Sequence, residues 1–219
     1  MVYQDSFCSI LPLSASNFSF SCPCRRIAKN AFVLSEKVGS TDQKIKLYYY
    51  IGAGHLESYL SGSNQLRKGF ASSLSSGDFN EAFFYAAHAV HFSIISAEKD
   101  LTSLLKEIDY YLLLLETYKS ELAKKFILCY RETVATLIDR CETTGIDAKI
   151  SYADVCDLGP NNKLQEVFYF HSVFRNYWLG YTERCHHYTQ ESLAISKEDS
   201  FFIVIIKFYR GKNVPALSL

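Results

Sequence analysis

A glycine turn followed by a long apolar segment, residues 77–90, constrains the fold of this chain more than any other stretch. Gly77 suits the left-handed backbone position that ends a helix. Asp78 suits the N-cap of the next helix, and Glu81, three residues on, is placed to complete a capping box. The residues that follow leave the second helix without a polar face, which is typical of a helix packed between neighbours. We therefore predict a helical hairpin whose second helix, about 78–97, is buried.

Other segments repeat apolar residues at the 3.6-residue period of an amphipathic helix. The low contents of Pro and Gly, 4 and 10 residues, also favour long helices over a turn-rich β fold. Asp100 and Ser120 are each placed to cap a helix, and Asn161 or Asn162 to cap another that ends near Leu179. The remaining predictions are helices over 25–37, 41–61, 65–75, 182–196 and 198–210, a break at Ser61–Asn64 and a loop over 141–160. In the helix after Ser120, the residues expected to face inward are Leu122, Phe126, Cys129, Val134, Leu137 and Ile138.

The turn at Gly77 has a counterpart at Gly180, 103 residues later, close to three periods of the roughly 34-residue tetratricopeptide (TPR) repeat. Each glycine follows an apolar helix and precedes an acidic residue. Small residues recur after both turns, at Ala82, Ala86 and Ala89 and at Cys185, Thr189 and Ser192. We therefore predict an all-α fold of TPR-like antiparallel helical hairpins stacked as a short α-solenoid.

The chain divides into three predicted parts: a poorly ordered leader at 1–24, a TPR-like helical-repeat domain at 25–210 and a C-terminal tail at 211–219. The leader is rich in Ser, Phe and Cys, and no basic segment precedes its apolar residues as a secretory signal would require. A cleaved signal peptide is the alternative interpretation. No later helix is available to cover the apolar side of 198–210, so we expect self-association through it. Its apolar residues include Phe201, Phe202, Ile203 and Ile206.

Charge and cysteine content narrow the partners and the compartment. The chain has 23 basic and 23 acidic residues, so it lacks the basic excess that nucleic acids and anionic membranes attract. No apolar run approaches the ~18 residues that can span a bilayer. The seven cysteines, an odd number with irregular spacings, favour reduced thiols over a disulfide framework. We therefore expect a cytoplasmic protein that binds neither nucleic acid nor membrane.

Packing positions in Leu74–Ala82, Ala87–Phe92, Lys99–Tyr111 and Phe168–Tyr181 follow a recognisable order. Over roughly 38–210, this order resembles the helical-repeat region of large multidomain signalling proteins. In that family, Ser/Thr-kinase-like and STAND-type AAA ATPase domains precede the helices, and GAF and histidine-kinase domains often follow them. None of these catalytic domains is present in the 219 residues, so no family active-site residue is carried over. The resemblance implies a non-enzymatic interaction or scaffold module, a fragment or relative of such a protein, whose partner is a protein or a neighbouring domain.

Motifs for nucleotide or phosphoryl chemistry are incomplete in this chain. Gly52-Ala53-Gly54 begins a nucleotide-binding pattern, but Glu57 stands in place of its third glycine. Asp78-Phe79-Asn80 lacks the final glycine of the kinase metal-binding triplet, and no His-Arg-Asp loop accompanies it. We interpret both stretches as structural.

Histidine and cysteine residues are the remaining candidates for a site. His88 and His91 lie one turn apart on a predicted helix, and His171 could join Cys185-His186-His187. Adjacent helical residues point about 100° apart, so His186 and His187 do not converge on one metal. We predict no catalytic, cofactor-binding or metal-binding residues and no cofactor. The alternative is a helical ligand- or metal-binding domain, or an enzyme, with a cavity lined by His88, His91 and aromatic residues.

Overall fold

The computed structural model describes residues 29–34, 37–38, 46, 58–97, 99–142 and 162–195. Every regular element in these ranges is an α-helix, which confirms the predicted all-α class. The helices that pack together are α4 (Tyr59–Ser75), α5 (Phe79–Ser96), α6 (Leu101–Tyr118), α7 (Glu121–Glu142), α9 (Asn162–Trp178) and α10 (Thr182–Ile195). Residues 29–34 are also helical, inside the helix expected over 25–37. The predictions that lie outside the described residues include the leader 1–24, most of the helix 41–61, most of the loop 141–160, the helix 198–210 and the tail 211–219.

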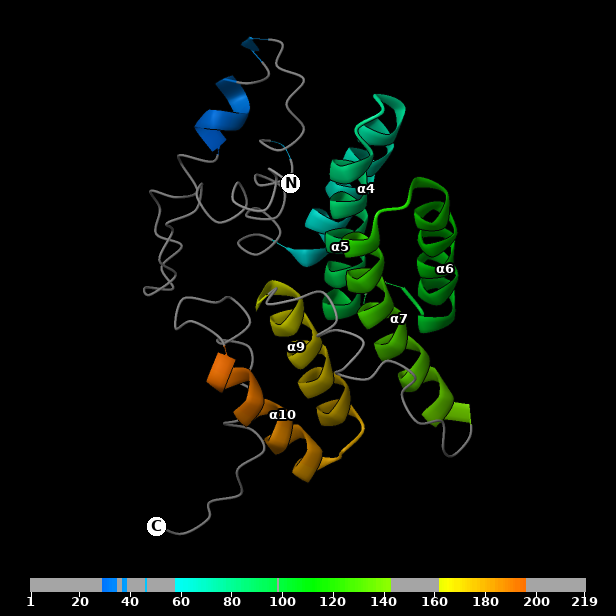
Figure 1. Ribbon diagram of the computed structural model, residues 1–219, viewed down its shortest axis with the longest axis vertical. Coiled ribbons are helices and arrows are strands. Elements are labelled where there is room, and N and C mark those ends of the chain that lie inside the picture. Colours follow the sequence, from blue (N-terminus) through cyan, green and yellow to red (C-terminus); the bar gives the residue numbers. More distant parts are fainter. Residues whose placement is uncertain are drawn as a thin grey trace.

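Consecutive helices pair as hairpins: α4 with α5, α6 with α7, and α9 with α10 (Figure 1). Helix α7 also packs against α5 and α9, so it joins all three pairs. Helix α6 packs mainly on α7 and less on α5, and it lies at the edge of the assembly of helices (Figure 1). One side of α6 therefore faces outward. Among the described residues, no helix combines the length and the apolarity needed to cross a bilayer.

The turns at Gly77 and Gly180 share one backbone geometry. Their φ angles are +80° and +73°, in the left-handed region that glycine adopts readily. At the first turn, the Gly77 N–H donates to the Leu74 carbonyl at 3.2 Å, and the next N–H donates to the Ser73 carbonyl at 2.9 Å. These are the two hydrogen bonds of a Schellman motif, and the second turn repeats both within residues 176–181. The predicted helix-ending role of both glycines is confirmed.

The capping box predicted at Asp78 is wrong. Asp78 occupies the N-cap of α5, but its side chain makes no capping hydrogen bond. Its backbone angles, φ −86° and ψ 69°, are not the extended conformation that directs an N-cap side chain toward the helix. Its N–H already donates to Ser73, so it is not available to Glu81 as a capping box requires. Asp100, in contrast, caps α6 as predicted, because its carboxylate accepts a 2.8 Å hydrogen bond from the Ser103 N–H.

The predicted break at Ser61–Asn64 is also wrong, and so is the end of the helix expected over 41–61. Helix α4 begins at Tyr59 and continues without interruption through this stretch, while Ser58 before it is extended and serves as the N-cap. The small residues of the stretch pack rather than turn, since Gly62 and Ser63 are both buried. Farther along α4, a Cβ added at Gly69 would collide with the ring of Tyr85 on α5. Small residues on α4 thus allow α4 and α5 to approach closely.

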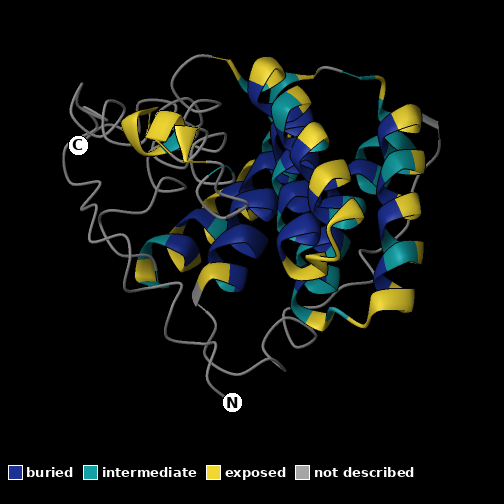
Figure 2. Cartoon of the chain, turned by 90° about the horizontal axis from the view of Figure 1, so that it is seen from above, coloured by how far each residue is buried: buried dark blue, intermediate teal, exposed yellow. Residues whose placement is uncertain are grey.

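Helix α5 is the centre of the core, as its uniformly apolar sequence predicts. Buried residues gather where the helices meet, and exposed residues lie on their outer sides (Figure 2). On α5, the fully buried residues include Ala82, Phe83, Tyr85, Ala86, Ala89, Val90 and Phe92. The three alanines expected to admit a neighbouring helix are therefore at the most tightly packed positions.

The inward side of α7 is broader than predicted. Cys129 and Val134 are buried as expected, but the other predicted inward residues are only partly buried: Leu122, Phe126, Leu137 and Ile138. The most buried positions include three that were not predicted: Ala123, Ile127 and Tyr130. The difference follows from packing on three sides, because α7 contacts α5, α6 and α9 at once. A pattern for a single buried stripe does not describe such a helix.

Candidate functional site

Two groups of polar side chains lie among the described helices, where buried polar and ionisable groups mark candidate sites. The Glu107 cluster joins α4, α5 and α6 and consists of Ser63, Arg67, Ser93, Lys99, Glu107 and Tyr111. The His171 cluster joins α5, α7 and α9 and consists of His91, Cys129, Tyr130, Glu132, His171 and Arg175. The members of each cluster come from distant parts of the chain, and the packing of the helices brings them together.

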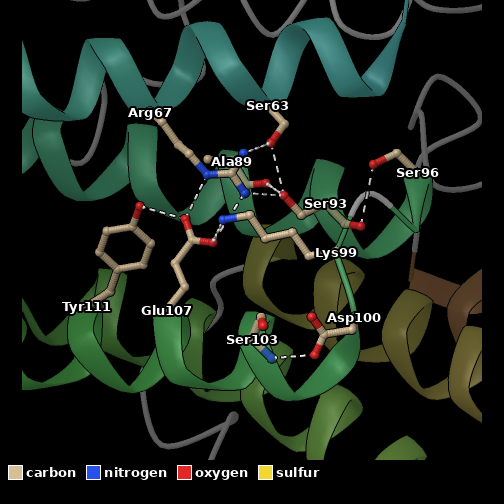
Figure 3. Close-up of polar contacts among 10 residues, drawn as sticks. All are labelled: Ser63, Arg67, Ala89, Ser93, Ser96, Lys99, Asp100, Ser103, Glu107 and Tyr111. Carbon is tan, nitrogen blue, oxygen red and sulfur yellow. Dashed lines mark hydrogen bonds and ion pairs between the residues drawn. The ribbon is translucent and has the colours of Figure 1, made fainter.

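In the Glu107 cluster, Arg67 from α4 meets the Glu107 carboxylate from α6 in a two-point contact (Figure 3). The Arg67 Nε donates to Oε1 at 2.7 Å and Nη2 donates to Oε2 at 3.2 Å. Lys99, in the connection before α6, donates from Nζ to Oε2 at 2.8 Å. The Tyr111 hydroxyl, one turn along α6, donates to Oε1 at 3.0 Å.

These contacts saturate the Glu107 carboxylate. An ionised carboxylate offers about four acceptor positions on its two oxygens. Arg67 fills two of them, and Lys99 and Tyr111 fill the other two. No acceptor position then remains for a metal ion or for a substrate proton, so the geometry is that of a structural clamp.

The guanidinium of Arg67 is also engaged by two serines. Its Nη1 donates to the Ser63 hydroxyl and its Nη2 to the Ser93 hydroxyl, both at 2.7 Å. Ser93 donates its own proton to the Ala89 carbonyl at 2.8 Å. The 2.9 Å contact between the two hydroxyls is therefore a donation from Ser63 to Ser93. The cluster ties α4 to both α5 and α6.

Electrostatics agree with a permanently ionised Glu107. Burial alone would raise the pKa of this carboxyl group, but the hydrogen bonds and positive charges of Arg67 and Lys99 outweigh burial and lower the pKa. Tyr111 responds in the opposite direction, because burial first and the adjacent Glu107 charge second raise the pKa of its hydroxyl. These pKa shifts keep Glu107 ionised and Tyr111 protonated near neutral pH, so neither group exchanges a proton there.

The His171 cluster centres on two buried imidazoles from different helices. Nδ1 of His91 on α5 lies 3.1 Å from Nε2 of His171 on α9, a hydrogen bond between the two rings. The ring of Tyr130 on α7 lies against His171, with 4.7 Å between the ring centroids. The two histidines and the tyrosine are almost completely buried, so this contact holds three helices together.

Burial also sets the protonation states in this cluster. Desolvation first and the nearby Arg175 charge second lower the pKa of His171 to about 3, so its ring is neutral at pH 7. Burial raises the pKa of the Cys129 thiol to about 12, which leaves it protonated and a poor nucleophile. The cluster thus lacks the thiolate that cysteine-based catalysis requires.

A small cavity of about 10 Å³ adjoins the His171 cluster. Residues from α7 and α9 line it: Cys129, Glu132, Thr133, Phe168, His171, Ser172 and Arg175. Two of the lining residues form a long ion pair, in which Nη1 of Arg175 and Oε1 of Glu132 are 3.9 Å apart, too far for a direct hydrogen bond. A volume of this size is about what one water molecule needs, and it excludes a substrate or a cofactor.

The histidines and cysteines considered from the sequence are dispersed by the fold. His88 and His91 share α5, but His91 bonds to His171, while His88 is half-buried and burial lowers its pKa to about 4. Cys185 is buried with its Sγ 3.7 Å from the Val173 carbonyl, and its neighbours His186 and His187 are exposed. Across the part of the chain that the structure describes, no three His, Cys, Asp or Glu side chains gather as metal ligands. The stretch Gly52–Gly54 lies outside the described residues.

Neither pairing was predicted from the sequence. Arg67 and Glu107 are 40 residues apart, and His91 and His171 are 80 apart, so no local spacing connects them. A partial signal was present, because Glu107 and His91 are polar residues within predominantly apolar helices and a buried polar group needs a partner. That signal identifies residues that require a partner without identifying the partner.

Compared with known protein families, with curated proteins and with solved structures, the chain has no match in any of the three comparisons.

Proposed function

We propose that the chain is a non-enzymatic helical-repeat interaction or scaffold module, built of TPR-like hairpins in a short α-solenoid and acting in the cytoplasm. The three consecutive hairpins and the matching Schellman turns at Gly77 and Gly180 support the repeat architecture. The order of packing positions that resembles the helical region of signalling ATPases and sensor kinases supports a role in signal transduction. Its partner is then a protein or a neighbouring domain.

The observation that carries the proposal is the outward side of α6. Helix α6 packs on α7 and α5 with its inner side, yet its outer side carries Tyr110 and Leu113, which are 52% and 65% exposed. Large exposed side chains one turn apart form an apolar strip on a helix. Contact with a partner protein would remove this strip from water, as hydrophobic cores of interfaces do. The buried groups of the Glu107 cluster, in contrast, bind one another.

The alternative is a ligand-binding, metal-binding or catalytic helical domain, and the His91–His171 pair beside the small cavity is the observation that favours it. Its weakness is the cavity volume, since about 10 Å³ does not accommodate an organic ligand. The arginine in the cavity wall also disfavours a metal cation. We therefore place this function second.

Site-specific photo-crosslinking tests the proposal. A photoreactive amino acid at position 113 is expected to give a discrete crosslinked product in extract from the source cells. The same group at the exposed Asn64 on α4 serves as the matched control and is expected to give none. Equal products from both positions, or none from Leu113, would contradict an interaction surface on α6.

Elemental analysis separates the two functions. The interaction module is expected to purify without metal, and nucleotides or divalent cations should not raise its melting temperature. A stoichiometric metal in the purified protein would favour the alternative instead.

A further inference from the structure

The cavity between α7 and α9 contains polar groups whose geometry calls for a small ligand. Nη1 of Arg175 and Oε1 of Glu132 form a long ion pair at 3.9 Å, and this distance allows one water molecule to contact both groups. Both side chains are largely buried, at 12% and 16% exposed, so bulk solvent does not readily replace such a bridge.

His171 provides a second, independent observation. It lines the same cavity and is 2% exposed. Its Nε2 bonds to His91, whereas its Nδ1 is buried and has no hydrogen-bond partner among the described residues. A buried ring nitrogen without a partner is costly, and one ordered water is the common remedy.

We propose that this cavity is a binding site for one internal water molecule, which accepts a hydrogen bond from Arg175 and donates to Glu132 and to Nδ1 of His171. Three hydrogen bonds are typical of buried water. The assignment of donors follows from chemistry, because a guanidinium only donates and an ionised carboxylate only accepts. One proton of the water is then used by Glu132, and the other is directed to the remaining acceptor, His171.

This arrangement determines the tautomers of both histidines. If Nδ1 of His171 accepts from the water, its proton lies on Nε2, which then donates to Nδ1 of His91. His91 in turn carries its proton on Nε2. The water thereby connects Glu132 and Arg175 to the histidine pair and links α5, α7 and α9 in one chain of hydrogen bonds.

Other occupants fit less well. A larger ligand exceeds the cavity volume of about 10 Å³. A metal cation would face the positive charge of Arg175, and no three candidate ligands gather among the described residues. The lowered pKa of His171 is consistent with a neutral ring that accepts rather than an imidazolium that donates from both nitrogens.

Nitrogen NMR on the wild-type chain tests the tautomers directly. Histidine labelled with ¹⁵N distinguishes protonated from bare ring nitrogens at pH 7, and the spectrum of His171→Gln assigns the signals of His171. We expect a bare Nδ1 and a protonated Nε2 at His171, with a contact between its ring and a long-lived water. A proton on Nδ1, or a dry cavity in a high-resolution crystal structure, would overturn the proposal.

A substitution pair supplies the second test. Arg175→Met removes the donor and is expected to abolish the contact between the His171 ring and water. Arg131→Met removes an exposed arginine from α7 and should leave that contact unchanged. Persistence of the bound water in folded Arg175→Met would contradict the site. If Arg175→Met does not fold, the wild-type tautomer and the wild-type crystal structure still decide the question.

Discussion

Glu107 and Asp109 show how burial decides the importance of an ion pair at the scale of single residues. Both lie on α6 and both accept from an arginine Nε at 2.7 Å, Glu107 from Arg67 and Asp109 from Arg131. The Glu107 side chain is 14% exposed and the Asp109 side chain 49% exposed. Solvent screens an exposed pair, whereas loss of one partner of a buried pair leaves an uncompensated charge.

Glu107→Gln is therefore expected to lower the free energy of unfolding by about 2–4 kcal/mol, because Arg67 and Lys99 lose their shared counter-charge. Asp109→Asn, the matched control on the same helix, should cost less than about 1 kcal/mol. Urea unfolding monitored by circular dichroism measures both values. Equal losses in the two variants would show that the Glu107 cluster is not a clamp.

His171 makes stability depend on pH in a defined direction. Its pKa in the folded protein is about 3, below the ordinary 6.5, so the unfolded chain binds a proton that the folded chain resists. The stability from the neutral ring is complete above about pH 6.5 and is lost as the pH falls toward 3. The expected slope is up to about 1.4 kcal/mol per pH unit for each such histidine. Half-buried His88, with a pKa of about 4, acts in the same direction.

We expect His171→Gln to flatten this dependence by about one proton between pH 6.5 and 4, whatever its effect on stability at pH 7. His186→Gln, a change at an exposed position of α10, is the matched control. Unfolding free energies from urea titrations at several pH values provide the comparison. A wild-type slope retained in His171→Gln would rule out a neutral, buried His171.

At the scale of the helices, the helix ends show which structural features can be predicted from the sequence. Gly77, Gly180 and Asp100 were predicted because each role depends only on neighbouring residues. The continuation of α4 through Ser61–Asn64 was not predicted, since Gly62 and Ser63 are buried by packing and Ser63 contacts Ser93, 30 residues away.

The same distinction applies to the candidate site. Glu107 and His91 were visible in the sequence as polar residues within apolar helices, but their partners lie 40 and 80 residues away. Such pairs depend on how the hairpins pack, which no local period encodes. The sequence thus predicts the helices well and the clusters between them poorly.

Among the helix ends that the structure describes, those of α5 and α6 have a non-glycine residue in the left-handed conformation, and the second of these leads to a prediction. Lys119, after α6, has φ +54°, a strained value for a residue with a Cβ. Lys119→Gly should raise the free energy of unfolding by about 0.5–1 kcal/mol, since the relief of strain exceeds the added entropy of the unfolded chain.

Gly77→Ala is the converse of Lys119→Gly, because it adds a Cβ at a left-handed position instead of removing one. A Cβ at Gly77 would meet nothing within 4 Å, so its cost is that of the backbone alone, about 1 kcal/mol. Urea unfolding should therefore give opposite signs for the two substitutions. Destabilisation by Lys119→Gly would mean that the lysine side chain contributes more than its strained backbone costs.

At the scale of the whole molecule, two clusters of polar side chains lie inside the described helices, while some large apolar side chains are exposed on the outside. The Glu107 and His171 clusters hold the hairpins against one another, while α6 presents Tyr110 and Leu113 outward. On this account, stability and partner binding reside in different residues and can be changed separately.

The most direct test of that separation compares how well three forms of the chain capture the partner that crosslinking identifies: the wild type, a surface double variant and Glu107→Gln. Each form is assayed below its own melting temperature. The double variant Tyr110→Ser/Leu113→Ser should keep the wild-type melting temperature, because surface changes usually shift stability by less than about 0.5 kcal/mol, and should lose capture. Glu107→Gln should melt several degrees lower and retain capture. Capture that is lost in Glu107→Gln while the protein is folded, and kept in the double variant, would contradict the account.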